Sequence, residues 1–310
     1  GPILFLLFIN DLPKSVDCPV CLFADDSKMY CRIPKMNSNK PELDGAHETL
    51  QKDLDELQNW AMKWKMSFNV EKCKILHFGK DNPNHDYRLN NTVIPTADEE
   101  KDLGILVDTS LKFSKHIKNI AARANRMIGL IKISFECLNK KMFQNLYLSL
   151  VRPLLEYCVQ AWSPYQSGDI ALLENVQRRA TRIVSGTTGM SYQQRLNYLE
   201  LPSLEERRIR GDMILTYRLL SGEEGIDYRK FFKLSDEHYV LREQHSKKLA
   251  RRTNLLAVRY NFFSQRVINK WNKLSEYEVS APCTAEFKRR YDEKEKLRRR
   301  NEMNNAFVPR

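Results

Sequence analysis

This 310-residue sequence gives no support for disulfides, for structural zinc or for a membrane anchor. The seven cysteines are odd in number and scattered, so reduced thiols are expected rather than a disulfide framework. Cys18 and Cys21 have metal-like spacing, but no second Cys or His pair completes a zinc site, and packing as small apolar residues explains them better. The apolar run from Ile3 to Ile9 is too short to span a bilayer and lacks the basic flank of a signal peptide.

Internal repeats, long low-complexity stretches and an initiating methionine are also missing. A chain of this length without repeats can bury one large core or two smaller ones. Because the sequence opens with Gly1-Pro2 rather than with Met, we interpret it as a fragment of a longer protein.

The charge of the chain is unevenly distributed. The formal net charge is +12, but residues 1–100 carry 12 Lys and Arg against 16 Asp and Glu, whereas residues 101–310 carry 39 against 23. An acidic half joined to a basic half suits a protein that holds metal in one part and a nucleic-acid backbone in the other. Generic solubility charge is the alternative, and it explains the net value but not the asymmetry.

Two adjacent acidic residues, Asp25 and Asp26, lie between two alternating apolar runs, Pro19 to Ala24 and Ser27 to Ile33. The alternation on both sides predicts a β-hairpin with the acid pair at its tip. Two-metal phosphoryl transfer needs such a rigid carboxylate platform to hold Mg²⁺ against a nucleotide's phosphates. An Asp-Asp turn without chemistry is the alternative, because Asp is an ordinary turn residue.

The chain changes from mixed to helical patterning near residue 109. Before it, Pro41 to Trp64 has helical spacing of apolar residues, and short strands are predicted over Ile75–Phe78, Asn91–Pro95 and Leu103–Val107. After it, helices are predicted to start near Ser114, Asn139, Ile170, Ser191, Ser203, Tyr260 and Thr284. An α/β part of about 105 residues therefore precedes a helical part about twice as long.

Several ordered motifs resemble the reverse transcriptases of non-LTR retrotransposons, most closely the Jockey and chicken-repeat groups. The segments that carry this resemblance are Gly1–Pro13, Phe23–Asp26, Trp64–Asn69, Lys72–Lys74, Asp102–Ile105, His116–Ile117, Leu150–Tyr157, Gln177–Arg182 and Phe262–Val267. They span nearly the whole chain and are far more specific together than one Asp pair.

The resemblance implies an α+β fold. A partial polymerase palm, with the hairpin, a small sheet and a packed helix, would occupy residues 1–108. An all-α, thumb-like domain would follow over residues 109–222, and a basic helical C-terminal region over residues 223–310. The fingers and the first catalytic Asp of the family would lie upstream of this sequence.

The same resemblance implies roles for the hairpin residues. Asp25 would bind Mg²⁺ or Mn²⁺, and Asp26 would be a weaker ligand or an electrostatic helper, because adjacent strand residues point to opposite faces. Phe23 would lie near the primer end, a role compatible with a strand core residue. Asp11 cannot easily supply the missing carboxylate, because Asn10 to Pro13 reads as a helix end where Asp is a turn residue.

Three further residues are candidates for contacts with the reacting strand. Lys72 or Lys74 could protonate the leaving pyrophosphate or hold the triphosphate, although a surface lysine is the favoured alternative for each. Gly104 matches the family's primer-gripping turn, where a glycine lets a backbone approach nucleic acid closely. A plain strand glycine is an equal alternative.

Basic side chains of the helical half form the second candidate site. Arg178, Arg179 and Arg182 lie off the apolar stripe of their helix and are predicted to contact nucleic acid. Similar basic ridges are predicted on the neighbouring helices, and a solvated face is the alternative for any one of them. Their residues are Lys115, Lys118, Arg123 and Arg126, then Arg207, Arg208 and Arg210. The charged run from Lys294 to Arg300 has no apolar stripe and is expected to be mobile.

The sequence therefore predicts part of an RNA-directed DNA polymerase that is inactive alone. An RNA template, a DNA primer and dNTPs would be its partners in the full-length enzyme, and a membrane would not. An intracellular location, nuclear and cytoplasmic, is expected. A non-enzymatic nucleic-acid-binding module, descended from such an element, is the alternative.

Overall fold

The computed structural model describes residues 1–34, 40–235, 245–253 and 256–306, leaving aside the side chains of residues 40–44 and 300–306. The chain divides into two compact units, Gly1–Leu111 and Lys112–Arg310. The first unit contains every strand of the described residues, and the second is helical except for one isolated bridge between Leu234 and Leu249. The predicted α+β class is confirmed.

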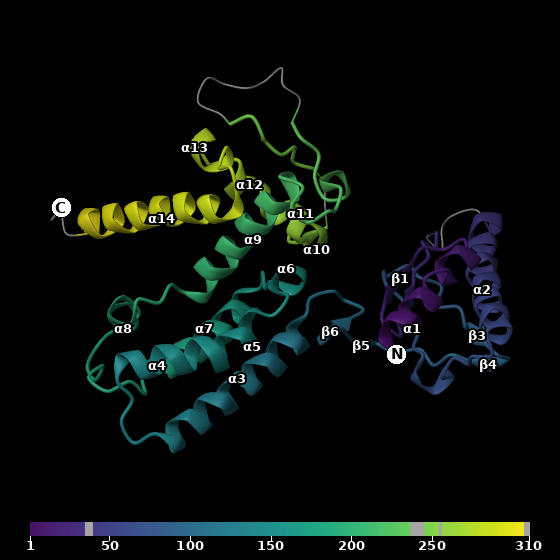
Figure 1. The fold of residues 1–310 in the computed structure, drawn as a ribbon, viewed down its shortest axis with the longest axis horizontal. Helices are drawn as coiled ribbons and strands as arrows, with labels where there is room; N and C mark the ends of the chain where they lie inside the picture. The colour runs from purple at the N-terminus through teal and green to yellow at the C-terminus, as the bar shows by residue number, and fades with distance from the viewer. Residues whose placement is uncertain (35–39, 236–244, 254–255, 307–310) are drawn as a thin grey trace. The chain divides into compact units, whose positions relative to one another are not determined.

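The first unit consists of two main helices and three β-hairpins (Figure 1). The helices are α1 (Pro2–Ile9) and α2 (Lys40–Lys63), with single 3₁₀ turns at Leu12–Ser15 and Val70–Lys72. Each hairpin is a separate two-stranded antiparallel sheet in the described part of the chain. The pairs are β1 (Val20–Phe23) with β2 (Asp26–Met29), β3 (Arg88–Leu89) with β4 (Thr92–Val93), and β5 (Glu99–Asp102) with β6 (Ile105–Asp108).

The core of the first unit forms around α2. Its buried residues Leu54, Leu57 and Ala61 follow the predicted apolar stripe, whereas Trp64, predicted to lie on that stripe, is 40% exposed. Trp60 takes its place in the core. The predicted strand over Ile75–Phe78 is wrong, because Ile75 makes only an isolated bridge to Thr96.

The second unit contains twelve α-helices in its described residues, several of them a single turn long. In chain order they are α3 (Ser114–Ser134), α4 (Lys140–Leu146), α5 (Arg152–Glu156), α6 (Val159–Trp162), α7 (Ser167–Thr181), α8 (Tyr192–Leu199), α9 (Leu204–Leu220), α10 (Ala257–Tyr260), α11 (Phe263–Arg266), α12 (Ile268–Trp271), α13 (Glu276–Val279) and α14 (Thr284–Ala306). A π-helical turn, Tyr147–Val151, joins α4 to α5, and Tyr228–Lys230 is a 3₁₀ turn. Helix α3 lies beside α5 and α7 (Figure 1).

Local capping signals set some of these helix starts. Ser191 and Ser203 each form a complete capping box, with Gln194 and Glu206, as predicted. Asn139 also caps α4, as predicted. Ser114 does not cap α3, because its hydroxyl instead donates to the carboxylate of Asp169, 2.6 Å away.

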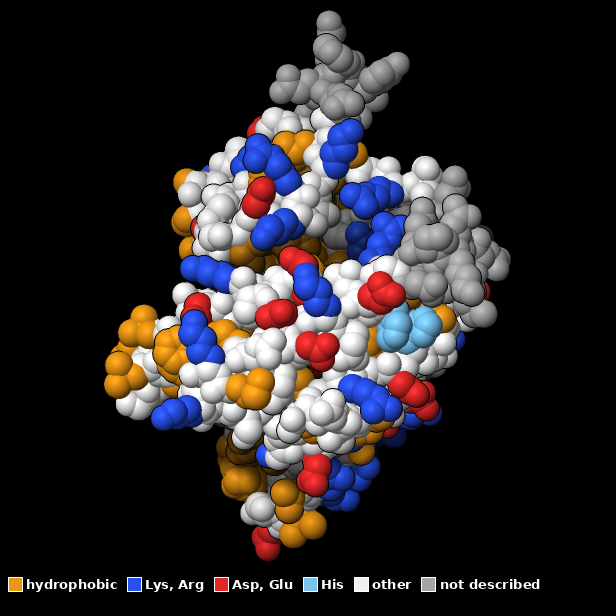
Figure 2. Space-filling model, turned by 90° about the vertical axis from the view of Figure 1, so that its right-hand side faces the viewer, with side chains coloured by type: hydrophobic (Ala, Val, Ile, Leu, Met, Phe, Trp, Pro, Cys, Tyr) orange, Lys and Arg blue, Asp and Glu red, His pale blue; other side chains and the backbone are white. Residues whose placement is uncertain are grey.

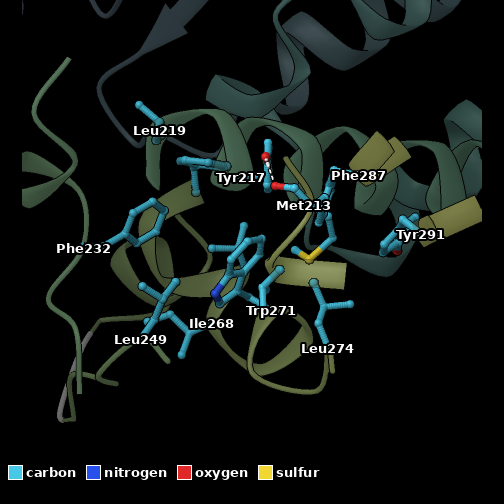
Figure 3. Close-up of a cluster of buried hydrophobic side chains, with 14 residues drawn as sticks. Met213, Tyr217, Leu219, Phe232, Leu249, Ile268, Trp271, Leu274, Phe287 and Tyr291 are labelled. Carbon is cyan, nitrogen blue, oxygen red and sulfur yellow. Dashed lines mark hydrogen bonds between the residues drawn. The ribbon is translucent and has the colours of Figure 1, made fainter. Parts of the chain in front are cut away.

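A second hydrophobic core joins α9 to the C-terminal helices. Figure 3 shows the indole of Trp271 at the middle of this cluster, with Tyr217 and Phe287 beyond it. Trp271 is fully buried, and the Tyr217 hydroxyl donates to the carbonyl of Ala281. The single helix predicted to run from Tyr260 to Leu274 is wrong, because α10 ends at Tyr260 and two short helices, α11 and α12, follow it and contribute to this core.

Within the described residues, no helix is both long enough and apolar enough to cross a membrane.

Candidate functional site

The acid pair lies at the tip of the predicted hairpin. Strands β1 and β2 pair antiparallel with Phe23 opposite Asp26, so Ala24 and Asp25 are the two turn residues. Asp25 is thus in the turn itself, and Asp26 is the first residue of β2. Ala24 adopts a left-handed φ of 53°, which costs an L-residue about 1 kcal/mol. The hairpin is therefore confirmed, and its two carboxylates occupy unequal positions.

Both side-chain carboxylates are exposed to solvent and have no partner among the described residues. Neither Asp25 nor Asp26 forms a hydrogen bond or ion pair with another residue that the structure describes, and the neighbouring Phe23 is 62% exposed. Carboxylate oxygens are the ligands that Mg²⁺ and Mn²⁺ prefer, so this pair fits a divalent cation. No group of three or more His, Cys, Asp or Glu suited to a metal ion occurs among the described residues. Within the described residues, the pair is thus two exposed carboxylates without a third such ligand beside them.

A buried carboxylate of α2 fixes the chain that enters the hairpin. Asp53 is 1% exposed and accepts hydrogen bonds from the backbone N–H groups of Asp17, at 3.1 Å, and Cys18, at 2.7 Å. Burial acts to raise the pKa of Asp53, but these hydrogen bonds outweigh it and hold the pKa below its ordinary value. The charged form of Asp53 therefore anchors the segment that leads into β1. Sequence reasoning missed this residue, because its partners lie about 35 positions away.

An ion pair ties the acidic hairpin to the hairpin that carries Gly104. The Nζ of Lys28, on β2, donates to both carboxylate oxygens of Asp102, at 2.6 and 2.8 Å. Asp102 ends β5, and Leu103 and Gly104 form the turn into β6. The predicted strand over Leu103–Val107 is therefore wrong at its start. Both turn residues have positive φ, 44° and 86°, and glycine suits the second.

The side chains of the two candidate lysines form no hydrogen bond or ion pair with these hairpins among the described residues. Lys72 ends a 3₁₀ turn, and Lys74 follows it in an extended segment. Both side chains are exposed, and neither makes a hydrogen bond or ion pair within the described ranges. Asp11, by contrast, has a structural partner, because its Oδ1 accepts a hydrogen bond from the Trp60 indole at 3.1 Å.

The predicted arginine ridge on α7 is exposed. Arg178, Arg179 and Arg182 make no ion pair with any described acidic residue. The Arg178 guanidinium lies over the ring of Tyr192, 4.7 Å from its centroid, and the buried Arg195 lies over the same ring at 5.7 Å. Burial and the nearby charge of Arg182 lower the pKa of Arg195. This positive field, without a carboxylate contact, suits an anionic ligand.

Several basic residues of α9 and α14 are held in ion pairs within the second unit. Arg207 forms a bidentate pair with Glu156 at 2.7 and 2.8 Å, and Arg210 a similar pair with Asp292. The run beginning at Lys294 is helical and docked rather than mobile up to residue 299, the last whose side chain is described. Its contacts are Lys294 with Glu278, and Arg298 and Arg299 with Glu206. The Arg300 side chain lies outside the described residues.

The surface also mixes charge signs elsewhere. Figure 2 shows acidic, basic and apolar side chains interspersed over the face that it draws. No single-sign patch dominates that face. Besides the exposed arginines at the end of α7, the predicted basic ridge of α3, with Lys118, Arg123 and Arg126, is also exposed and is an equal cationic candidate.

Comparison with known proteins shows similarity to reverse transcriptases. Residues 1–113 match the family described as reverse transcriptase (RNA-dependent DNA polymerase). The RNA-directed DNA polymerase from mobile element jockey of Drosophila melanogaster is 29% identical over 203 residues, which covers 60% of this chain and 21% of that protein. The jockey polymerase of Drosophila funebris is 26% identical over 204 residues, with the same coverage. No solved structure matches the chain.

A third relative extends the pattern to another element. The probable RNA-directed DNA polymerase from transposon X-element of Drosophila melanogaster is 24% identical over 199 residues, covering 60% of this chain and 21% of that protein. Residues 1–113 thus match the reverse transcriptase family, and 60% of the chain is homologous to RNA-directed DNA polymerases of the non-LTR elements jockey and X-element, in line with the resemblance of its motifs. That family consists of nucleotidyltransferases that use divalent metal ions. The chain spans about a fifth of the length of these relatives, 21% in each case.

Proposed function

We propose that this chain is part of an RNA-directed DNA polymerase of a non-LTR retrotransposon, which copies element RNA into DNA. The observation that carries the proposal is the uncommitted acid pair, Asp25 and Asp26, at the tip of a hairpin in a reverse transcriptase domain. Residues 1–108 would form the palm part, residues 109–222 a thumb-like domain, and residues 223–310 a basic helical region. RNA template, DNA primer and dNTP are the proposed partners, in the nucleus and cytoplasm.

The hairpin's contribution is to position oxygen ligands rigidly. Asp25 projects from the turn and would hold the cation, Mg²⁺ or Mn²⁺, while Asp26 would assist from the first strand position. When bound, such cations stabilise the negative charge that develops on the transferring phosphoryl group. Asp53 and Lys28 keep the hairpin in place from either end, so the carboxylates cost little reorganisation when they bind.

The remaining candidates act on the strands. Phe23, exposed next to the acid pair, would contact the primer end, and the Gly104 turn, linked to β2 through Lys28, would approach the primer backbone. Lys72 and Lys74 would meet the leaving pyrophosphate. Arg178, Arg179 and Arg182 would contact phosphates of the template–primer duplex.

Primer extension tests the proposal. The chain alone is expected not to extend a primer on RNA with Mg²⁺, because no group of three or more His, Cys, Asp or Glu suited to a metal ion occurs among its described residues. In a longer protein that contains this chain and polymerises, Asp25→Asn should abolish extension and Asp26→Asn should weaken it less. Asp81→Asn, an exposed carboxylate outside the hairpin, is the matched control. Equal loss in the control, or full activity in Asp25→Asn, would refute the assignment.

A nucleic-acid-binding module without catalysis is the second candidate. The exposed arginines of α7 favour it, because they lack acidic partners in the described part of the chain and need no metal. Retained duplex binding in a longer protein that does not extend primers under any divalent cation would favour this module over the polymerase.

A further inference from the structure

One arginine of α9 is buried without a partner. Arg208 is 5% exposed, and its Nη2 is buried without a hydrogen bond. Its side chain makes no ion pair or hydrogen bond with any residue that the structure describes. Its neighbours Arg207 and Arg210, in contrast, each hold a carboxylate through two hydrogen bonds. The other three arginines of α9, Arg207, Arg210 and Arg218, each form an ion pair with a carboxylate, whereas Arg208 forms none among the described residues.

A buried guanidinium without a direct partner is costly. Burial lowers the pKa of Arg208, and the charges of Glu174, Glu205, Asp212 and Glu156, none of which forms a hydrogen bond or ion pair with it, oppose that effect. Arginine hardly releases its proton in proteins, so it cannot escape the cost by becoming neutral. A buried charge without a polar partner destabilises the folded state far more than an unpaired charge at the surface, because water solvates only the surface charge. An anion from outside the chain would relieve this cost.

Arg208 lines a small open pocket with two other cations. The pocket has a volume of about 180 Å³ and is bounded by α9, α11 and α12 and by the residues after α6. Arg266 and Lys270 lie in its wall. Arg266 is already bound to Asp212, at 2.9 Å through two hydrogen bonds, and Lys270 is exposed. Arg208 and Lys270 are thus the two cations of this pocket that an incoming anion can neutralise.

The acidic residues of the pocket limit what it can bind. Asp212 is committed to Arg266, and Glu205, which also lines the pocket, is exposed. A carboxylate ligand offers two oxygens to one guanidinium. A phosphate monoester offers three oxygens and close to two negative charges at neutral pH, so it can face Arg208 and Lys270 together.

We propose that this pocket, the Arg208 pocket, binds a phosphate group, either inorganic phosphate or the 5′-terminal phosphate monoester of a nucleic-acid strand. Its volume of about 180 Å³ accommodates one phosphate group but not a duplex. A strand end could therefore enter where a continuous double helix could not. The site is separate from the acid pair and does not depend on the polymerase assignment.

The test uses the full chain and three probes at low ionic strength. The probes are inorganic phosphate and two single-stranded oligonucleotides of one sequence, with a 5′-phosphate or a 5′-hydroxyl end. Calorimetry should show one phosphate per chain, and the 5′-phosphorylated strand should bind more tightly than its hydroxyl counterpart. Inorganic phosphate should remove that difference by competition. Binding of phosphate with no preference between the strands would assign the site to the free ion.

Two variants and a control locate the site. Arg208→Met should weaken phosphate binding by at least about tenfold, because a charge-assisted contact is lost. Lys270→Gln, an exposed change that the fold should tolerate, should weaken it several-fold. Lys273→Gln is the matched control, because Lys273 lines the larger groove beside α14 but not the Arg208 pocket. If circular dichroism shows that Arg208→Met does not fold, the phosphate affinities of Lys270→Gln and Lys273→Gln are compared instead. A weaker affinity in Lys270→Gln than in Lys273→Gln then supports the proposed site. No phosphate binding, or equal losses in those two variants, would overturn the proposal.

Discussion

The buried carboxylate of Asp53 holds the backbone that leads into the acidic hairpin, whereas the exposed carboxylates of Asp25 and Asp26 hold no other residue that the structure describes. The Asp53 carboxylate satisfies two backbone N–H groups that lead into the acidic hairpin. Replacing Asp53 with Asn removes the charge and one acceptor at a site that is 1% exposed. Leaving a buried donor unsatisfied costs about 1–3 kcal/mol. We therefore expect faster hydrogen exchange over residues 17–29 in Asp53→Asn, measured by mass spectrometry. Unchanged exchange there would mean that the hairpin is held by other contacts.

The pH dependence of the same residue has a definite sign. Because the folded pKa of Asp53 lies below its ordinary value, its contribution to stability is present above about pH 4 and is lost as the pH falls through the folded pKa. Urea unfolding of the first unit should therefore show a lower stability at pH 3 than at pH 7, and Asp53→Asn should reduce that difference. An equal pH dependence in the variant would contradict the role given to Asp53.

The arginine ridge of α7 provides a third prediction at the scale of residues. Replacing Arg178, Arg179 and Arg182 with Gln should weaken duplex binding across all sequences and reduce the salt slope by up to about one unit per lost phosphate contact. The control replaces three exposed lysines elsewhere in the second unit with Gln and so removes the same number of positive charges. These lysines are Lys230, Lys233 and Lys288. Fluorescence anisotropy over a salt series measures both. Equal effects in the two variants would show that net charge, rather than the ridge, governs binding.

At the scale of elements, the start of α9 combines a local cap with a distant contact. Glu206 completes the capping box of Ser203 and also accepts from Arg299 of α14, at 3.0 Å. Ser203→Ala should destabilise the second unit by about 1 kcal/mol, because an N-terminal cap is lost. Ser185→Ala, an exposed serine whose side chain makes no hydrogen bond among the described residues, is the control. Chemical denaturation followed by circular dichroism tests this, and equal midpoints in the two variants would contradict it.

Elements set by neighbouring residues were predictable from the sequence, and contacts between distant residues were not. The caps at Asn139, Ser191 and Ser203 and the acidic hairpin depend on residues within a few positions of one another. The partners of Arg207, Arg210 and Arg299 lie 51, 82 and 93 positions away. A basic run therefore looks the same in sequence whether it faces solvent or closes an internal ion pair.

The residues of the candidate site show the same difference between local features, which the sequence predicts, and contacts between distant residues, which it does not. The sequence placed Asp25 and Asp26 correctly at a hairpin tip, because alternation and turn chemistry are local. It could not show that Lys28 joins this hairpin to Asp102, 74 positions later. It also could not distinguish the buried, unpartnered Arg208 from the paired arginines on either side of it.

At the scale of the whole molecule, the division into Gly1–Leu111 and Lys112–Arg310 separates the acidic hairpin from the basic helices. We expect residues 112–310 to fold alone, because they form a compact unit with a hydrophobic core of its own, and to bind duplex or hybrid nucleic acid without sequence preference. Affinity should fall steeply with salt, since phosphate contacts release counterions. A flat salt dependence in anisotropy measurements would point instead to a protein partner. Circular dichroism at each salt concentration controls for weakening of the internal ion pairs.

The docking of α14 has a consequence for shortened copies of the gene. Phe287 and Tyr291, near its start, belong to the core around Trp271, and Arg298 and Arg299 reach back to α9. A stop codon ahead of Thr284 would remove these side chains and uncover apolar surface on α9 and α12. Such a product would be open to chaperones and proteases, whereas a stop after Arg299 would spare the core. The open reading frame through α14 is thus a requirement for an intact fold, not a dispensable tail.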